Sequence, residues 1–331
     1  MKTKQKDEMY CGVNYSKIKE AKPILSKENF PLFLDFMRER FRVHVKKDIL
    51  KEAPPWTENK ILQEYKFTNV FREDDRVTRA LLNEVSKNNS LTLEEKVVNS
   101  ILFRAWNNPR TFKLLGGPFK ADVMYDTEKL KKQARPIFKK ISEAEPKYLW
   151  FSSAYNQGGT KVACQNENLD GTGEFEPDIP LRIFHICSWL KELDMYNRLM
   201  NAKNQKEAYE IISDVRGFAR FLAYQIFVDL SYIEEFPFSE NEFTIAGPGC
   251  RKGIDLVFEE KSGMTYEECL FWLRDHLKTQ HYIELRRELK KQGKDINVMS
   301  LENCMCEISK YIRTYNGTGR PRCHYKPRKE D

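Results

Sequence analysis

Apolar residues recur at steps of three and four through most of this chain, which is the spacing of amphipathic helices. Runs that alternate apolar and polar residues are few. We therefore expect a mainly α fold. The spacing predicts helices or helical turns over residues 30–47, 91–106, 111–115, 128–141, 180–200, 206–212, 266–277 and 301–315.

Residues 213–255 combine two glycine-punctuated turns, each followed by an apolar segment. Gly217 precedes a predicted helix that ends near a single acid, Asp229, and the second turn covers residues 246–253. The pattern is typical of a helix-hairpin-helix, whose glycine turn offers backbone N–H groups to a phosphate. A plain turn or helix cap fits the same residues, and Asp229 fits a capped or salt-bridged structural acid equally well.

A second informative segment spans residues 66–82, in which Arg72, Asp75, Arg76 and Arg79 are spaced three or four apart on one face. Such a face is either a salt-bridge ladder or an anion clamp, because arginines held by an acid present rigid forks to phosphate oxygens. The residues that we expect to contact phosphate or DNA are Arg72, Arg76, Gly217, Gly249, Arg251, Lys252 and Gly253.

Composition sets broad limits on the protein. The 331 residues are 40% apolar and 12% aromatic, which is enough for one large domain or two ordinary ones. The net charge of +7 permits DNA as a partner without requiring it. The eight cysteines are scattered, which favours a reducing compartment. Since no apolar signal region or membrane-length run is present, we expect a cytoplasmic protein without a membrane partner.

Two kinds of chemistry lack support in the sequence. The phosphate-binding pattern GxxxxGK[ST] is absent, which argues against a self-contained nucleotide kinase of that class. Cys304, Cys306, Cys323 and His324 suggest zinc, but two thiols that are two residues apart on a helix point to different sides. We therefore expect neither a metal nor a cofactor.

Four segments, in their order along the chain, resemble a known family. They are KFTNVFREDDRV at 66–77, FLAYQI with DL at 221–230, GPGCRKG at 247–253, and LENCMCE with KY at 301–311. Together they are similar to the helical domain of phage thymine-hypermodification proteins, the alpha-glutamyl/putrescinyl thymine pyrophosphorylase group. That group is related to the helical domain of hydroxymethyluracil DNA kinases.

The resemblance implies a helical domain like those of helix-hairpin-helix DNA glycosylases, acting on a base in DNA. It implies a 5-methyl group that carries a phosphate or pyrophosphate, which an amine such as an amino acid or polyamine replaces. The kinase relatives carry an additional P-loop domain, so its absence favours a transferase. We expect a basic arm and helix at 1–55, a helical catalytic domain at 56–316 and a basic tail at 317–331, with host cytoplasm as the location if the chain is phage-encoded.

Under this reading the target base leaves the stack and enters a pocket. Arg72, Arg76 and Arg251 would stabilise the charge of the departing phosphate. A carboxylate would take a proton from the attacking ammonium, with Asp229 as first choice and Asp75 as second. The residues expected to line the base pocket are Phe67, Asn69, Tyr155, Tyr224 and Gln225.

Two alternatives stay open at the level of sequence. Asp229 could instead steady a developing cation at the sugar, which would make the protein a DNA glycosylase for a modified base. The chain could also be a DNA-binding module without catalytic activity.

Overall fold

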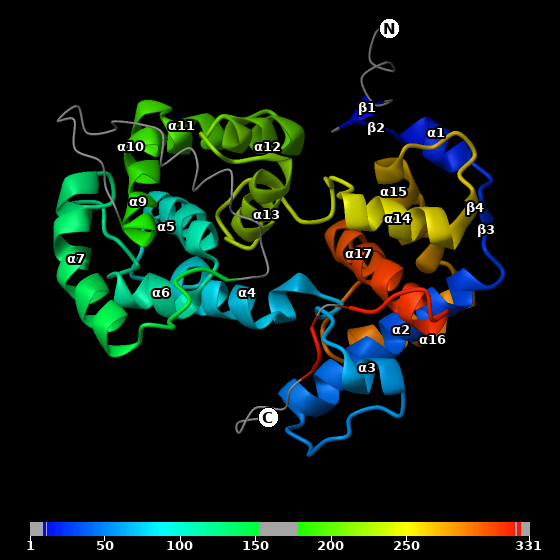
Figure 1. Ribbon diagram of the computed structural model, residues 1–331. Helices are drawn as coiled ribbons and strands as arrows, with labels where there is room; N and C mark the ends of the chain where they lie inside the picture. Colours follow the sequence, from blue (N-terminus) through cyan, green and yellow to red (C-terminus); the bar gives the residue numbers. More distant parts are fainter. Residues whose placement is uncertain (1–8, 11, 153–177, 322, 326–331) are drawn as a thin grey trace, which may run out of the picture. The chain divides into compact units, whose positions relative to one another are not determined.

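The computed structural model describes residues 9–10, 12–152, 178–321 and 323–325. The chain divides into two compact units. Unit 1 comprises Met1–Asp75 and Asn241–Asp331, and unit 2 comprises Arg76–Glu240. Both units are built mainly from helices, as predicted (Figure 1). The predicted boundaries at residues 55 and 316 stay a prediction.

Unit 1 joins segments from both ends of the chain (Figure 1). Its first part contains β1 (Met9–Tyr10), β2 (Val13–Asn14), α1 (Tyr15–Glu20), β3 (Ile24–Leu25), α2 (Asn29–His44) and α3 (Lys60–Glu64). Its second part contains α14 (Pro248–Val257), β4 (Phe258–Glu260), α15 (Tyr266–Leu277), α16 (Ile283–Lys290) and α17 (Val298–Tyr315). Strand β1 pairs with β2 and β3 with β4, both antiparallel, so the second pair ties the two parts together.

Helix α17 lies at the centre of unit 1. Of its 18 residues 13 are buried, and they lie on every side of the helix. Helix α2 packs against it, and four apolar residues of α2 that recur at helical spacing are buried: Phe33, Phe36, Met37 and Phe41. Because every residue from Val298 to Met305 is buried, polar side chains of this part of α17, such as Glu302 and Asn303, are also taken out of water.

Helix α14 packs very closely on α17, and two glycines permit this. A Cβ atom at Gly253 would lie 1.9 Å from the carbonyl oxygen of Met305, and one at Gly249 would lie 2.4 Å from the Cys306 thiol. Residues 246–253, which the sequence suggests as a loop, are therefore mostly helical. Pro248 suits the first helical position because its missing N–H is not needed there, and Gly249 and Gly253 contact a neighbouring helix.

Unit 2 is a bundle of helices. Its described residues contain α4 (Arg76–Leu81), α5 (Leu93–Trp106), α6 (Pro109–Leu114), α7 (Thr127–Ala144), α9 (Ile179–Arg182), α10 (His185–Glu192), α11 (Met195–Met200), α12 (Gln205–Ser213) and α13 (Arg220–Leu230). The helix predicted over residues 180–200 is in fact three, and the chain takes a left-handed conformation at Asp194, between α10 and α11. Trp106, Phe112 and Phe184 are fully buried, and their rings contact one another in the core.

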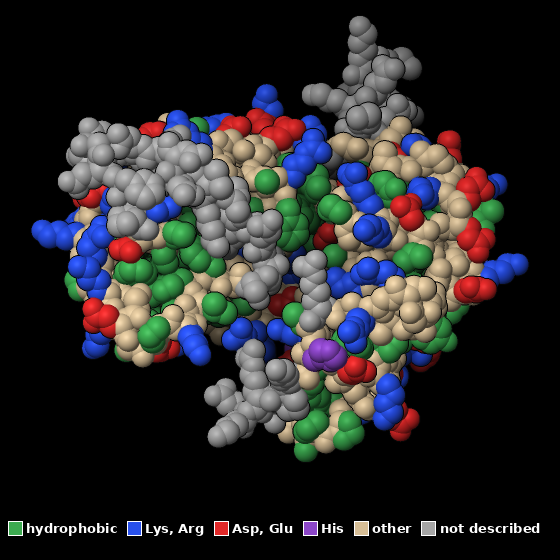
Figure 2. Space-filling model, in the orientation of Figure 1, with side chains coloured by type: hydrophobic (Ala, Val, Ile, Leu, Met, Phe, Trp, Pro, Cys, Tyr) green, Lys and Arg blue, Asp and Glu red, His purple; other side chains and the backbone are tan. Residues whose placement is uncertain are grey.

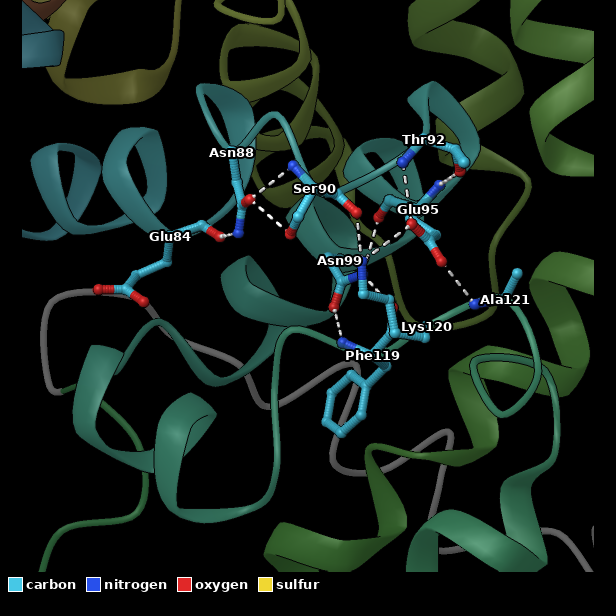
Figure 3. Close-up of polar contacts among 9 residues, drawn as sticks. All are labelled: Glu84, Asn88, Ser90, Thr92, Glu95, Asn99, Phe119, Lys120 and Ala121. Carbon is cyan, nitrogen blue, oxygen red and sulfur yellow. Dashed lines mark hydrogen bonds and ion pairs between the residues drawn. The ribbon is translucent and has the colours of Figure 1, made fainter.

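Helix α5 holds the loop that follows α6 (Figure 3). Thr92 and Glu95 form a capping box: the Thr92 hydroxyl accepts the Glu95 N–H at 3.2 Å, and Glu95 Oε2 accepts the Thr92 N–H at 2.9 Å. Glu95 Oε1 accepts the Ala121 N–H at 2.7 Å, and buried Asn99 bonds both the N–H and the carbonyl of Phe119 at 2.6 and 2.7 Å. Polar groups of a loop that enters the core are thus satisfied by side chains of α5.

In the described residues, no helix combines the length and the hydrophobicity that crossing a bilayer requires.

The contact between α14 and α17 predicts an ordered series of stabilities. Alanine in a helix is normally favoured over glycine by about 1 kcal/mol, yet Gly253→Ala should lower the free energy of unfolding by about 1–3 kcal/mol because its Cβ meets backbone. Gly249→Ala should cost less, since the Cys306 side chain can turn away. Urea denaturation measures both.

Gly247→Ala is the matched control, because its Cβ would lie 3.7 Å from the nearest atom, Glu302 Oε1, and its φ of −69° suits alanine. A Gly253→Ala protein as stable as the wild type would contradict the packing described here.

Candidate active site

The segment over residues 67–75 crosses unit 1 between α2 and α17. Arg40 on α2 donates a hydrogen bond to the Phe67 carbonyl at 3.3 Å. On the other side, the Asn303 amide of α17 donates to the Asn69 carbonyl at 2.8 Å. Both helices therefore fix the course of a segment that has little regular structure of its own.

This segment ends in a tight polar turn. The Asn69 N–H donates to Asp75 Oδ1 at 2.9 Å, and the Asn69 side chain donates to the Asp74 carbonyl at 2.7 Å. Lys294 Nζ bonds Glu73 at 2.7 Å and Asp74 at 2.9 Å. These bonds hold a short 3₁₀ turn, Arg72–Asp74, and an extended Asp75.

The prediction that Arg72, Asp75, Arg76 and Arg79 share one helical face is therefore wrong. Arg72 lies in the 3₁₀ turn, and α4 begins only at Arg76. Asn69 captures the Asp75 carboxylate and so keeps that residue in extended backbone. Arg72 and Asp75 belong to unit 1, whereas Arg76 and Arg79 belong to unit 2.

Two carboxyl groups of unit 1 have raised pKa values. Burial raises the pKa of Asp75 to about 6, although the Asn69 N–H, Arg72 and Arg40 oppose the rise. Burial raises the pKa of Glu302, on α17, to about 7, opposed by Arg72 and by the Gly247 N–H. Arg72 thus acts on both acids, and its own side chain is buried. Perturbed acids that share a cation are typical of functional sites.

The start of α14 adjoins this cluster. Glu302 accepts the Gly247 N–H, and Glu267 accepts the Ala246 N–H at 3.0 Å. Two carboxylates therefore accept the first two amides of the turn over residues 246–253, which the sequence suggested as a phosphate-binding turn. Arg251 and Lys252 are exposed, and Figure 2 shows lysine and arginine side chains gathered over α14 and α17. Their contact with phosphate stays a prediction.

Metal ligands do not gather in the part of the chain that the structure describes: no three His, Cys, Asp or Glu side chains are placed to hold an ion. Within the group that suggested zinc, Cys304 is buried and its thiol lies 3.7 Å from the Val70 carbonyl.

Comparison with known proteins identifies the family. The family model of the 5-hmdU DNA kinase helical domain matches residues 27–319. The chain belongs to this family. It is 27% identical over 288 residues to a 5-hmdU DNA kinase of Bacillus phage SP10. That alignment covers 84% of this chain and 44% of the phage kinase, so the chain spans less than half of its relative. No solved structure matches.

In unit 2 of this helical domain, Asp229 has a partner that sequence reasoning missed. The Asp229 side chain is fully buried, and Arg104 of α5 donates to its two oxygens at 2.5 Å each. Arg104 also donates to Asn107 at 2.9 Å. Arg104 follows Val97 by seven residues, so both lie on the same side of the predicted helix. A cation on the apolar side of a helix indicates that a buried acid pairs with it. The catalytic role of Asp229 stays a prediction.

The remaining predicted residues are divided between the units. Phe67 and Asn69 are buried beside the Asp75 turn in unit 1. Tyr224 and Gln225 are buried on α13 of unit 2, and Gly217 has a φ of +77° before that helix. Tyr155 lies outside the described residues. Glu302, Arg40 and Asn303 were not predicted as site residues, although Glu302 between the apolar residues Leu301 and Met305 of a predicted helix is a readable signal.

The raised pKa of Glu302 predicts how stability depends on pH. Because the pKa of Glu302 is higher in the folded than in the unfolded protein, a proton on Glu302 favours the folded state. This contribution to the free energy of unfolding is complete below about pH 4.5 and is lost as pH rises through about 7. Glu302→Gln should therefore match the wild type at pH 4.5 and exceed it at pH 8.5 by about 1–3 kcal/mol. Urea denaturation at both pH values measures this. A pH-independent difference would contradict the assignment.

The buried Asp229–Arg104 ion pair predicts a loss of stability when only one of its partners is removed. Asp229→Asn leaves the Arg104 charge buried without its counter-ion, so the free energy of unfolding should fall by about 3–5 kcal/mol. The double variant Asp229→Leu with Arg104→Met removes both charges and should recover most of the loss. Denaturation at pH 7 measures both proteins, and wild-type stability in Asp229→Asn would show that the pair is dispensable.

Proposed function

We propose that this chain is a transferase of thymine hypermodification, which replaces the phosphate or pyrophosphate on a 5-hydroxymethyluracil base in DNA by an amine. The relation to a phage 5-hmdU DNA kinase supports the substrate class. The observation that carries the chemistry is the pair of desolvated acids, Asp75 and Glu302, whose pKa values are both lowered by the charge of buried Arg72 and raised more strongly by burial.

The reaction needs a base, because an amine is protonated at neutral pH and an ammonium has no free electron pair. A carboxyl group with a pKa near 6 is ionised at pH 7 and is a better proton acceptor than an ordinary aspartate. Asp75 is therefore the preferred base. The amine nitrogen then forms a bond to the methylene carbon as the carbon–oxygen bond breaks, and the oxygen leaves with its electron pair on the phosphate.

The leaving group gains negative charge in this step. Arg72 is buried, and a guanidinium in a desolvated site stabilises developing charge more strongly than it would in water. Glu302, with a pKa of about 7, is partly protonated at neutral pH and can donate a proton to the departing phosphate. A base and an acid that are influenced by the same cation would thus serve the two ends of the displacement.

We propose further that α12, the Gly217 turn and α13 form the helix-hairpin-helix that a glycosylase-like domain would present to DNA. Support comes from two packed helices joined by a short connection in which Gly217 takes a positive φ of 77°, a conformation that glycine adopts readily.

Nucleoside mass spectrometry tests the proposed reaction. DNA carrying pyrophosphorylated 5-hydroxymethyluracil is incubated with the protein and with glutamate or putrescine, and then digested. We expect an amine-bearing nucleoside and released pyrophosphate. Asp75→Asn should reduce the rate by about 10²–10⁴-fold, and Arg72→Ala by about 10²–10³-fold. In the wild type, kcat/KM should fall as pH drops through about 6, since the base becomes protonated.

Glu284→Gln is the control variant, because Glu284 is an exposed acid of α16 in the same unit. Each contrary result has its own meaning. A free modified base would identify a glycosylase, and unchanged nucleosides with retained DNA binding would identify a non-catalytic module. Full activity in Asp75→Asn would remove that residue from the mechanism.

A further inference from the structure

A buried histidine lies beside the turn that carries Arg72, and the mechanism above does not use it. His44 is the last residue of α2, and the chain continues from it as a wider π-helical turn, Val45–Ile49. Only 5% of His44 is exposed. The end of α2 therefore places a side chain that can carry a positive charge inside unit 1.

Both ring nitrogens of His44 lie close to a carboxylate. Nδ1 is 2.9 Å from Asp48 Oδ2, and Nε2 is 3.4 Å from Asp74 Oδ2. Because an ionised carboxylate only accepts hydrogen bonds, Nδ1 must be the donor to Asp48. A neutral ring has one N–H, so the lone pair of Nε2 would then face the Asp74 oxygen. Both contacts are therefore attractive only when both nitrogens carry a proton.

The Asp74 carboxylate has a need for this charge. Its Oδ1 accepts a hydrogen bond from Lys294 at 2.9 Å, which stabilises the ionised form, and Lys294 also bonds Glu73 at 2.7 Å. Its Oδ2 is buried and accepts no hydrogen bond from the described residues. Because a buried anionic oxygen without a hydrogen bond costs free energy, the charge of His44 at 3.4 Å compensates part of that cost.

Each of the two carboxylates also interacts with a second cation. Asp74 bonds Lys294, and Asp48 interacts with the charge of Arg40, which lies one helical turn before His44 on α2. A variant without His44 thus keeps one cation for each carboxylate. Such a variant should fold, and its effect on the turn can be measured.

Asp74 connects His44 to the groups that the proposed reaction uses. The Asp74 carbonyl accepts a hydrogen bond from the Asn69 side chain at 2.7 Å, and the Asn69 N–H donates to Asp75 Oδ1 at 2.9 Å. The Asp75 N–H donates to the Arg72 carbonyl at 3.0 Å and closes the turn. A shift of Asp74 would therefore reach Asp75 and Arg72 through the hydrogen bonds of one short turn.

We propose that His44 is a positioning residue of unit 1. Its protonated ring, held between Asp48 and Asp74, fixes the Arg72–Asp74 turn and so keeps Asp75 in its buried place. The importance of Asp75 for a reaction rests on the proposed function, whereas the contacts of His44 do not. A histidine that only filled space in the core would need no carboxylate at either nitrogen.

Carbon-13 NMR of the Asp75 carboxyl group tests the proposal without an assay of activity. Burial raises the pKa of Asp75 to about 6 in the wild type. In His44→Gln the turn loses a cation and should open to water, so the titration midpoint of Asp75 should fall by about one pH unit or more. His281→Gln is the matched control, because His281 is an exposed histidine of the same unit.

The Asp74→Asn background separates the charge of His44 from its packing. Asparagine has no charge for the ring to compensate, so adding His44→Gln to this background should change the Asp75 midpoint little. An unchanged midpoint in His44→Gln alone would overturn the proposal. An equal fall in both backgrounds would overturn it as well, because it would show that the ring acts by filling space.

The wild-type ring provides a measurement that needs no variant. Since both nitrogens are buried against carboxylates, both ring N–H protons of His44 should be visible by nitrogen-15 NMR at pH 6, and a missing Nε2 proton would overturn the proposal. If amine transfer takes place, His44→Gln should lower kcat about tenfold or more with an unchanged KM for the amine. Absence of transfer in the wild type would count against the proposed function alone, because the NMR measurements need no reaction.

Discussion

Unit 1 depends on the close approach of α14 to α17. Gly253 lets the two backbones meet where any side chain would collide with the Met305 carbonyl. The approach completes the burial of α17 and brings the N-terminus of α14 against Glu302, which accepts the Gly247 N–H. A packing constraint of the hydrophobic core thereby sets the electrostatic environment of a carboxyl group, since burial and the helix end act on the same side chain.

Burying charge around α17 lowers the stability of the fold and makes unusual chemistry available. Asp75 and Glu302 would be ordinary acids in water, and desolvation moves their pKa values towards neutrality. The charge of Arg72 limits the pKa shift at both carboxyls without cancelling it. Burial that outweighs the opposing charge is a poor way to stabilise a core, but it leaves two groups that can exchange protons near pH 7.

Asp229 in unit 2 is the opposite case. It is buried more completely than Asp75, yet Arg104 meets both of its oxygens in a two-point ion pair. A carboxylate held in this way is fixed in position and links α13 to α5. Burial alone therefore does not set the properties of an acid, because these also depend on how fully the surrounding groups satisfy its charge.

Local patterns of the sequence determined most helices of this protein. The apolar spacing of α2, the capping box of α5 and the apolar faces of α15 and α17 depend on residues a few positions apart, so they can be read without tertiary information. The four segments that resemble the thymine-hypermodification proteins likewise indicated the family, and they included Arg72 and Asp75. Tertiary structure decided which charged groups meet. Asn69 draws Asp75 out of the helix that its spacing predicts, Arg104 joins Asp229 from 125 residues away, and Glu302 reaches the start of α14. Those outcomes depend on contacts between distant segments and on the water that the contacts exclude, and neither leaves a periodic signal in the chain.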